Sequence, residues 1–509
     1  MSFASPLFLW YFMPAVLAAV LVAPRSWRNG IITTASLVFY ATGAGPTTLL
    51  LLGTMVVNYA VGPALEPDEW DLEPERRRRV LVGVVSFDVA VLVVWKYAGF
   101  ATAQAAALAS TTGLDLPVVQ LALPIGISFY TFHHISYVVD IYRGERPALR
   151  DPVSFATYIS MFPQLVAGPI VRYREIADQL PQQRNHRLDD IAAGFPRFAL
   201  GLTKKVVIAD SLAPMVDACF ATPADEMTTA VAWLGAIGYT LQLYFDFSGY
   251  SDMAIGLGRM LGFRLPENFA RPYSSATITE FWRRWHMSLS RWFRDYVYLP
   301  MGGNRRGSRT TYRNLTIVFV LVGFWHGANW TFLVWGLYHG ALLVIERRQG
   351  WGVPAADPER LVARRALTLL LVVVGWVLFR SPDLGAALGM LQHMLILDLG
   401  GLTDVVDAAL TNQRLLIGGD GGSVALALSE ELPAAAGGPH IGAIGLAGDG
   451  EDGLFGAVVV AAQALAVGGA GGAAWPGVAV VFVAGGGGSA AAGVDAGPVA
   501  GFEEAAEPG

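Results

Sequence analysis

The chain has 509 residues, of which 54% are hydrophobic and 15% are charged. A soluble globular protein carries about 25% charged residues, so this depletion excludes an ordinary soluble protein and indicates a polytopic membrane protein. The formal net charge of −6 is set by the last 109 residues, which hold 12 acidic residues and one basic residue, so the preceding body is mildly basic.

Apolar segments recur as far as residue 398 and do not alternate with polar residues in the manner of strands, so we expect an all-α fold. Several segments are shorter than the roughly 20 residues of a straight span, which indicates broken or re-entrant helices. The expected segments are 7–23, 31–43, 46–63, 80–99, 116–135, 152–170, 191–213, 228–247, 314–345, 364–380 and 384–398.

The flanking charges predict a location in the cell (inner or plasma) membrane and an orientation. The first apolar run has no preceding positive charge, which favours a retained span over a cleaved signal peptide. Arginines follow the first, third and fifth segments, which places the N-terminus outside. Further arginines after 152–170 break the alternation, and the prolines and glycine of FPQLVAGPIVRY favour a re-entrant segment there. Cys219 is the only cysteine, so neither an intrachain disulfide nor a thiolate metal site is expected.

The stretch FWRRWHMSLSRWFRDYVYLPMGGNRRG (281–307) concentrates three Trp and six Arg. At 100° per residue, Trp282, Trp285, Leu289 and Trp292 fall on one side of a continuous helix, the arginines fall opposite, and His286 lies on the border. Such a helix is expected in the plane of the membrane interface. A surface anchor would show the same pattern, but an anchor has no use for the titratable Glu280, His286 and Asp295.

A second candidate site is TIVFVLVGFWHGANWTFLVWGLYHGALLVIE (316–346). Apart from tyrosines, its ionisable side chains before Glu346 are His326 and His339. An imidazole at bilayer depth needs a cavity or a partner, and the sequence GAN after His326 predicts a break that would line a cavity. Burial favours a neutral imidazole, the form of a general base. A structural, hydrogen-bonded histidine is the alternative, and it suits His339 better.

Weaker signals are SFYTFHHISYVVD and YFDFSGYSD, which place His133, His134, Asp140, Asp246 and Asp252 in apolar surroundings. They indicate either a polar pathway or hydrogen bonds between packed helices. Adjacent histidines point about 100° apart on a helix and make a poor metal pair. The sequence contains no motif for metal-dependent or nucleotide-hydrolysing chemistry, and no feature indicates nucleic-acid binding.

The composition changes near residue 400. Twenty-six of the 58 glycines lie in the last 109 residues, without helical periodicity. We therefore expect two parts, a membrane domain 1–398 and a Gly/Ala-rich acidic tail 399–509 that is disordered. A frameshift in a GC-rich gene would produce such a tail, and a genuine extension is the alternative.

Together, TEFWRRWHMSLSRWFRDYVYLPMGGNRRG and VGFWHGANWTFLVWGLYHG resemble the membrane-bound O-acyltransferase family, and in particular its bacterial alginate O-acetylation branch. The stretches SPLFLWYFMPAVL, WKYAGF, LPIGISFYTFHHISYVVDIYRGE, FPQLVAGPIVRY and LYFDFSGYSDMAIGLGRMLGFRLPENFARPY match as well. The resemblance covers about residues 1–398. It implies a ring of about 10–12 tilted and re-entrant helices around a central tunnel. Members of this branch continue with further apolar spans where this chain has its tail. We expect the replacement of these final spans to affect both assembly of the helices and activity.

The resemblance assigns roles to individual residues. His326 matches the family's catalytic histidine and His286 matches the second signature histidine. His326 would act as general base on an acceptor hydroxyl, and His286 would orient the donor or a relay water. We expect Asn329, or a backbone N–H near the break, to stabilise the oxyanion. The donor would be held by the remaining predicted binding residues, which are Arg284, Arg291, Arg294 and Trp285.

The implied activity is an acyltransferase reaction, the transfer of an acetyl group for O-acetylation of an alginate-like exopolysaccharide. The donor would be acetyl-CoA or another cytoplasmic acyl thioester, with no bound cofactor or metal. The implied partners are the lipid bilayer, a periplasmic or extracellular acetyltransferase and the polysaccharide. D-alanyl transfer to teichoic acid is the alternative within the enzyme class. From other classes, a transporter of an acyl or polysaccharide intermediate and a non-catalytic scaffold of an export complex remain open.

Overall fold

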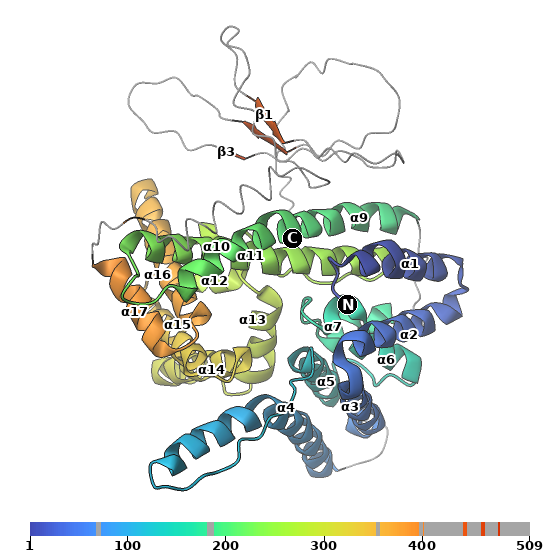
Figure 1. Ribbon diagram of the computed structural model, residues 1–509. Coiled ribbons are helices and arrows are strands. Elements are labelled where there is room, and N and C mark those ends of the chain that lie inside the picture. The colour runs from blue at the N-terminus through green and yellow to red at the C-terminus, as the bar shows by residue number, and fades with distance from the viewer. Residues whose placement is uncertain are drawn as a thin grey trace, which may run out of the picture. The chain divides into compact units, whose positions relative to one another are not determined.

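A computed structural model describes residues 1–67, 73–180, 188–352, 357–396 and 401, and the backbone of three short strands beyond them. The chain divides into two compact units, Met1–Ala409 and Leu410–Gly509. All regular structure described in the first unit is helical (Figure 1), as the apolar segments predict.

The first unit begins with a group of helices up to residue 110. They are η1 (Phe8–Phe12), α1 (Met13–Val22), α2 (Arg25–Ala44), η2 (Gly45–Thr47), α3 (Thr48–Val61), η3 (Gly62–Leu65) and α4 (Pro74–Ser110). The next group is α5 (Ile127–Tyr142), α6 (Pro152–Ser160), α7 (Phe162–Leu165), α8 (Tyr173–Ile176), η4 (Ala177–Gln179), α9 (Leu188–Thr203), η5 (Lys204–Ala209), α10 (Asp210–Ala221) and α11 (Thr229–Met260). The last group is η6 (Pro272–Ser274), α12 (Ile278–Arg284), α13 (Met287–Phe293), η7 (Arg294–Tyr298), α14 (Gly307–His326), α15 (Trp330–Arg348), α16 (Pro358–Arg380) and α17 (Leu384–Leu395).

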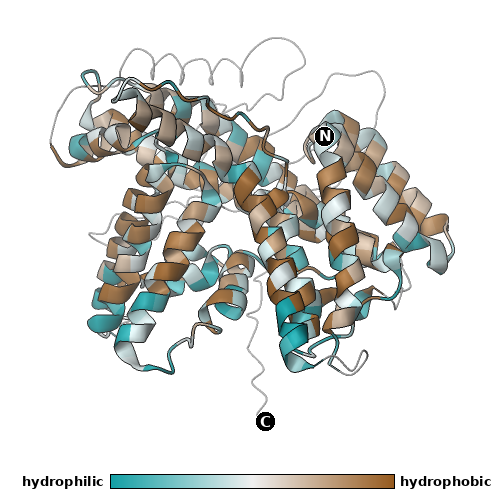
Figure 2. Cartoon of the chain, turned by 90° about the horizontal axis from the view of Figure 1, so that it is seen from below, coloured by the Kyte–Doolittle hydropathy of each residue, from teal (hydrophilic) through white to brown (hydrophobic). Residues whose placement is uncertain are grey.

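Three helical stretches among the described residues are long and apolar enough to cross a membrane, namely Arg25–Leu65, Pro74–Ser110 and Pro358–Arg380. Helix α4 has 37 residues, yet only Val84 and Asp88 are buried in it. Several of its apolar side chains, among them Val82, Val89 and Val94, are exposed, which water disfavours and lipid accommodates. Figure 2 shows hydrophobic residues along most helices and hydrophilic residues gathered near several helix ends.

The predicted segment 116–135 is only partly a helix. Residues 114–124 are non-helical, and α5 begins at Ile127. Pro117 and Pro124 lie in the non-helical part, and a proline removes a helical hydrogen bond and disfavours helix in the residue before it. The extended segment lies against α4, where the Val119 N–H donates to the Thr102 hydroxyl over 3.1 Å.

The segment 152–170 is broken, as its prolines and glycine predict. Helix α6 has nine residues and α7 has four. At 1.5 Å per residue, neither helix approaches the length of a straight span. Most residues of the segment are buried, so protein covers the irregular backbone that lipid could not satisfy.

The helix break predicted after His326 is confirmed. Helix α14 ends at His326, Gly327 and Asn329 have extended backbones, and α15 starts at Trp330. The two helices pack so closely that a Cβ on Gly323 would lie 2.3 Å from the Phe332 carbonyl oxygen. A Cβ on Gly336 would lie 2.3 Å from the Phe319 carbonyl oxygen. The glycine contact therefore fixes the position of the α14 end that carries His326.

Two features outside this hairpin complete the first unit. Helix α9 runs beside α11 (Figure 1), where glycines of both helices allow close backbone approach. Cys219 of α10 is a buried free thiol. It lies next to Gly235 of α11, where an added Cβ would be 2.8 Å from the Cys219 Cβ.

In the second unit, β1 (Ile441–Ile444), β2 (Val460–Gln463) and β3 (Gly477–Val478) form an antiparallel sheet in the order β1-β2-β3. Ile441 pairs with Gln463, and Ala462 pairs with Val478. The predicted disorder of the tail 399–509, the frameshift interpretation included, falls outside the described residues and stays a prediction.

Candidate active site

The Trp–Arg stretch does not form the single helix predicted for it. Helix α12 ends at Arg284, Trp285 is extended, and His286 has a left-handed backbone with φ of 45° before α13 begins. The preceding strap, residues 264–276, holds this break by two main-chain hydrogen bonds. Ala270 N–H donates to the Arg284 carbonyl, and Met287 N–H donates to the Asn268 carbonyl, both over 3.0 Å. These bonds satisfy backbone groups that the break removes from the helix.

The two-sided character of the stretch is nevertheless present. The side chains of Trp282, Trp285, Leu289 and Trp292 are buried. The arginines are less covered, and Arg283 and Arg294 are exposed. Trp285 lies in an aromatic cluster, with its ring 4.9 Å from Trp376 and 5.0 Å from Phe269. Its surroundings are therefore those of a packed core residue.

His286 is 1% exposed and lies at the N-terminus of α13. Its Nδ1 is 3.1 Å from the Asn268 Oδ1. Its Nε2 is buried and has no hydrogen-bond partner among the described residues. The imidazole packs edge-on against Phe247, with ring centroids 4.7 Å apart. One nitrogen is thus anchored to the protein, and the other remains available to a bound group.

His326 is the last residue of α14 and is half-buried. Aromatic rings surround its imidazole, with Trp325 at 4.7 Å, Phe379 at 4.9 Å and Trp335 at 5.1 Å between centroids. No hydrogen bond joins either ring nitrogen to another described residue. A histidine in an apolar surround without a fixed partner is suited to accept a proton from a bound hydroxyl.

Trp325 connects the two histidines and reveals a residue that sequence analysis missed. Its ring contacts that of His326 and lies 6.1 Å from that of His286. Lys96 of α4 places its Nζ 5.6 Å from the centre of the same ring and donates to the Trp325 carbonyl oxygen. Tyr97 donates its hydroxyl to the Phe324 carbonyl oxygen. The matched motif WKYAGF therefore caps the C-terminus of α14, where carbonyl groups lack helical partners.

The break after His326 offers backbone donors. The side chain of Asn329 caps α15, because its Oδ1 accepts from the Thr331 N–H over 3.1 Å. Its Nδ2 donates to the Pro382 carbonyl over 2.8 Å. In contrast, the N–H groups of Ala328 and Asn329 make no hydrogen bond within the described chain. Of the two oxyanion donors predicted from sequence, the backbone is the freer one.

The predicted arginines differ in their surroundings. Arg284 forms an ion pair with Glu280 at 2.6 Å and donates to the Ser274 hydroxyl over 2.9 Å. Arg294 pairs with Asp295 at 2.7 Å. Arg291 is half-buried, and among the described residues it has no ion-pair or hydrogen-bond partner. Arg291 is therefore the most available of the three for an anionic ligand.

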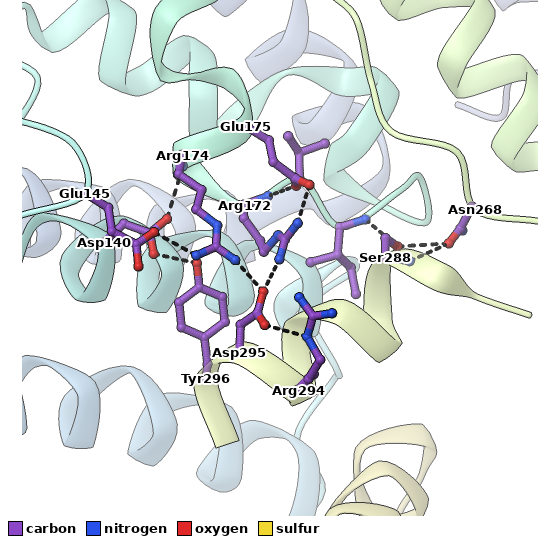
Figure 3. A network of polar contacts seen from close by, with 12 residues as sticks. Asp140, Glu145, Arg172, Arg174, Glu175, Asn268, Ser288, Arg294, Asp295 and Tyr296 are labelled. Atoms are coloured by element: carbon purple, nitrogen blue, oxygen red, sulfur yellow. Dashed lines mark hydrogen bonds and ion pairs between the residues drawn. The ribbon is translucent and has the colours of Figure 1, made fainter. Parts of the chain in front are cut away.

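Asp295 is the centre of a buried ionic network (Figure 3). Arg172, Arg174 and Arg294 all point toward its carboxylate. Burial raises the pKa of this carboxyl, but hydrogen bonding to Arg294 and the positive charges around it outweigh burial, so its pKa lies below the usual range. The network continues through Arg174, whose N–H donates to Asp140, and Asp140 also accepts from the Tyr296 hydroxyl over 2.7 Å. It ties η7 to α5 and α8.

His339, Asp252 and Asp246 have polar partners among the described residues, whereas the ring nitrogens of His133 and His134 have none. The Trp282 Nε1–H donates to the Nδ1 of the buried His339 over 3.4 Å. Asp252 pairs with Arg197 and Lys204, and Asp246 pairs with Lys205. His133 and His134 are fully buried in α5. Within the described chain, no group of three His, Cys, Asp or Glu side chains is placed to hold a metal ion.

Two cavities adjoin the site. A cavity of about 470 Å³ lies between α4, α5, α13 and α14, and Trp325 forms part of its largely apolar wall. A second cavity of about 280 Å³, which we call the arginine-rimmed cavity, is lined by apolar side chains together with Arg283, Arg294 and Arg347.

Comparisons with known proteins agree on one family. A model of the membrane-bound O-acyltransferase family matches residues 143–367. The chain is similar to the probable alginate O-acetylase AlgI of Azotobacter vinelandii, with 46% identity over 416 residues, 82% of this chain and 82% of that protein. It is 35% identical to the peptidoglycan O-acetyltransferase of Helicobacter pylori over 77% of this chain and 79% of that protein. It is 30% identical to the teichoic acid D-alanyltransferase of Bacillus subtilis over 43% of this chain and 58% of that protein.

Proposed function

The chain belongs to the membrane-bound O-acyltransferase family, and from this premise we propose that it acetylates hydroxyl groups of an alginate-like exopolysaccharide. It is a multi-pass membrane protein and an O-acyltransferase. The similarity to alginate O-acetylases covers 82% of the chain, which supports this substrate class over the others among its relatives.

The observation that carries the mechanism is the position of His326 at the end of a broken helix, beside Trp325 and His286. In the proposed reaction, a nitrogen of His326 takes the proton of an acceptor hydroxyl. The hydroxyl oxygen attacks the carbonyl carbon of the acetyl thioester. The tetrahedral intermediate then collapses, the C–S bond breaks, and His326 gives its proton to the departing sulfur, which leaves as a thiol. General base catalysis of this kind contributes about 10²–10⁴-fold to a rate.

Backbone N–H groups at the break would stabilise the oxyanion. Ala328 and Asn329 have N–H groups without partners in the described chain, and they lie within three residues of the base. Donors fixed before the reaction stabilise developing charge because they need no reorganisation. The Asn329 side chain holds the loop in place through Thr331 and Pro382.

We propose acetyl-CoA as the donor, or another acetyl thioester of the cytoplasm. Its anionic groups would bind the arginines of the α12–η7 region, with Arg291 and Arg294 as the main contacts and Arg284 and Trp285 as supports. Guanidinium groups match phosphate oxygens in geometry as well as in charge. Of these residues, Arg294 lines the arginine-rimmed cavity, which is large enough for part of such a ligand.

The remaining parts of the proposal concern the membrane. A tunnel between the helices would bring the donor from the cytoplasm to an acceptor on the other face, with the N-terminus outside. A periplasmic or extracellular transferase would complete delivery to the polysaccharide. The outward-facing apolar surface of α4 supports a lipid-embedded ring. D-alanyl transfer is less well supported, since the similarity to that relative covers 43% of the chain.

The test uses a strain from which the gene has been deleted. The acetyl content of its exopolysaccharide is measured by mass spectrometry, with and without the complementing gene, and with His326→Ala. We expect O-acetylation to be lost in the deletion, restored by the wild-type gene and not restored by His326→Ala at equal membrane abundance. Unchanged O-acetylation after deletion would contradict the substrate class. Full complementation by His326→Ala would contradict the catalytic role.

A further inference from the structure

Asn268 forms hydrogen bonds with three residues at the break between α12 and α13 and in α11. Its side chain is 1% exposed. Its Oδ1 lies 3.2 Å from the Ser288 N–H, 2.9 Å from the Ser288 hydroxyl and 3.1 Å from the His286 Nδ1. Its Nδ2 donates to the Ser251 hydroxyl over 3.1 Å. Both ends of the amide are therefore engaged, and its orientation is determined.

The orientation follows from the main chain alone. A backbone N–H can only donate, so the Asn268 atom that faces the Ser288 N–H must be the oxygen. The Ser288 hydroxyl accepts from the Ile170 N–H over 3.0 Å, which directs its own hydrogen toward the same oxygen. An amide turned the other way would place N–H groups against N–H groups at a buried site.

The oxygen of Asn268 in turn determines the state of His286. An amide oxygen only accepts hydrogen bonds, so the Nδ1 at 3.1 Å must carry the proton. In a neutral imidazole the other nitrogen then has a lone pair and no hydrogen. That nitrogen, Nε2, is buried and has no partner in the described chain.

We propose that Asn268 is a positioning residue that fixes His286 as the Nδ1-protonated tautomer, so that Nε2 accepts a hydrogen bond from a hydroxyl group or a water molecule. This inference rests on the proposed function and sharpens it. A neutral His286 with this tautomer has no hydrogen to donate from Nε2 to the carbonyl oxygen of the thioester. Its ligand is therefore an O–H group on the acceptor side of the reaction, the acceptor hydroxyl or a water that relays its proton.

The backbone at His286 also contributes to its contact with Asn268. His286 is one of two non-glycine residues with positive φ in the described chain, a backbone conformation that side chains with a Cβ rarely adopt. The hydrogen bond from Met287 N–H to the Asn268 carbonyl holds that conformation. Asn268 thus binds the segment by its main chain and the imidazole by its side chain.

The experiment measures how fast O-acetyl groups enter the exopolysaccharide after induction of each variant, normalised to the amount of protein in the membrane. Asn268→Leu removes the acceptor oxygen and should lower this rate at least about tenfold, since the imidazole is free to present a hydrogen instead. Asn268→Asp keeps an oxygen for Nδ1 but adds a negative charge that favours the imidazolium, whose Nε2 carries a hydrogen, so its rate should fall at neutral pH and rise again as the pH is raised. Ser251→Ala is the matched control, because it removes the bond at the other end of the amide and leaves His286 in place.

A double-mutant cycle separates tautomer control from general support of the fold. In a His286→Gln background, Asn268→Leu should change the rate less than about twofold, because no tautomer remains to be fixed. An equal loss in both backgrounds would overturn the inference. If His286→Gln has no measurable rate, the comparison of Asn268→Leu with Ser251→Ala decides, and an equal loss of rate in these two variants would overturn the inference. A failure of the proposed function would give a different result. In that case His326→Ala would acetylate the exopolysaccharide as fast as wild type.

Discussion

The ammonium group of Lys96 lies 5.6 Å from the centre of the Trp325 ring and donates to the carbonyl oxygen of the same residue. A cation at a helix C-terminus stabilises the carbonyl end of the helix dipole. Since His326 directly follows Trp325, this contact between α4 and α14 determines where the proposed base is held. No carboxylate forms an ion pair with Lys96 in the described chain, so its charge is directed to the helix end.

Replacing Lys96 should therefore impair acyl transfer without preventing membrane insertion. We expect Lys96→Met to lower the O-acetylation rate about tenfold, because the end of α14 loses its charged partner. Tyr97→Phe is the control, since it removes the neighbouring bond to the Phe324 carbonyl and changes no charge. It should reduce the rate less than about threefold. A wild-type rate in Lys96→Met would show that the contact does not matter for catalysis.

A larger side chain at Gly336 should separate α14 from α15. A Cβ at this position would lie 2.3 Å from the Phe319 carbonyl oxygen, so Gly336→Leu must displace one helix. We expect the free energy of unfolding to fall by about 1–3 kcal/mol and the thermal unfolding midpoint in detergent to fall with it. Gly340→Ala offers a comparison in the same helix, where the new Cβ would lie 3.4 Å from the Phe319 side chain. Equal midpoints for the two variants would contradict the close packing.

Neutralising Asp295 should lower the free energy of unfolding. Asp295→Asn leaves Arg172 and Arg174 facing each other without the carboxylate between them. Removing one partner of a buried ionic network costs about 3–5 kcal/mol. The thermal midpoint of Asp295→Asn should fall clearly below that of Asp178→Asn, which disrupts the exposed Arg146–Asp178 pair, a type of pair worth at most about 1 kcal/mol. Similar losses in both variants would mean that the network contributes little.

The same carboxylate should make the protein sensitive to acid. The pKa of Asp295 lies below its ordinary value in the folded protein, because its arginine contacts outweigh burial. The unfolded chain therefore binds the proton first as the pH falls. The contribution of Asp295 is complete above about pH 4 and decreases as the pH drops below that value. In unfolding measurements between about pH 2 and pH 6, which extend about two units to either side of the ordinary carboxyl pKa, the stability of Asp295→Asn should fall less steeply with decreasing pH than that of wild type. Parallel curves would refute this assignment.

Among the arginines of the proposed donor site, Arg291 should affect donor binding alone, and Arg284 should also affect stability. Arg291 has no partner in the described chain, so Arg291→Gln should raise the apparent KM for acetyl-CoA about tenfold in membrane vesicles and leave the thermal midpoint unchanged. Arg284→Gln breaks the pair with Glu280 and should affect the midpoint as well. An unchanged KM for Arg291→Gln would remove this residue from the proposed donor site.

Much of the site could be predicted because its signals are local. The sequence GAN after His326 predicts the helix break, since Gly and Asn interrupt an otherwise apolar helix. The pairing of Arg284 with Glu280 could also have been predicted, because the two residues are four apart on one helix. Both features depend only on residues within one turn of each other.

The features that were missed depend on distant segments. Lys96 and Trp325 are 229 residues apart, so no pattern in either segment indicates the contact. A helical wheel treats 281–298 as continuous, but the strap that contains Asn268 breaks that helix by hydrogen bonds of its own. The extended segment 114–124 was predicted as part of a helix because its residues are apolar, although its prolines indicate otherwise.

The single buried thiol of Cys219 makes this chain a suitable background for site-specific labelling. A fully covered thiol reacts slowly with water-soluble maleimides, so a new cysteine on an exposed loop would be the main labelled position in intact cells. Cysteines placed in turn after each apolar segment would report which loops face outward. The topology inferred from the arginine counts could thus be measured without first removing a native cysteine.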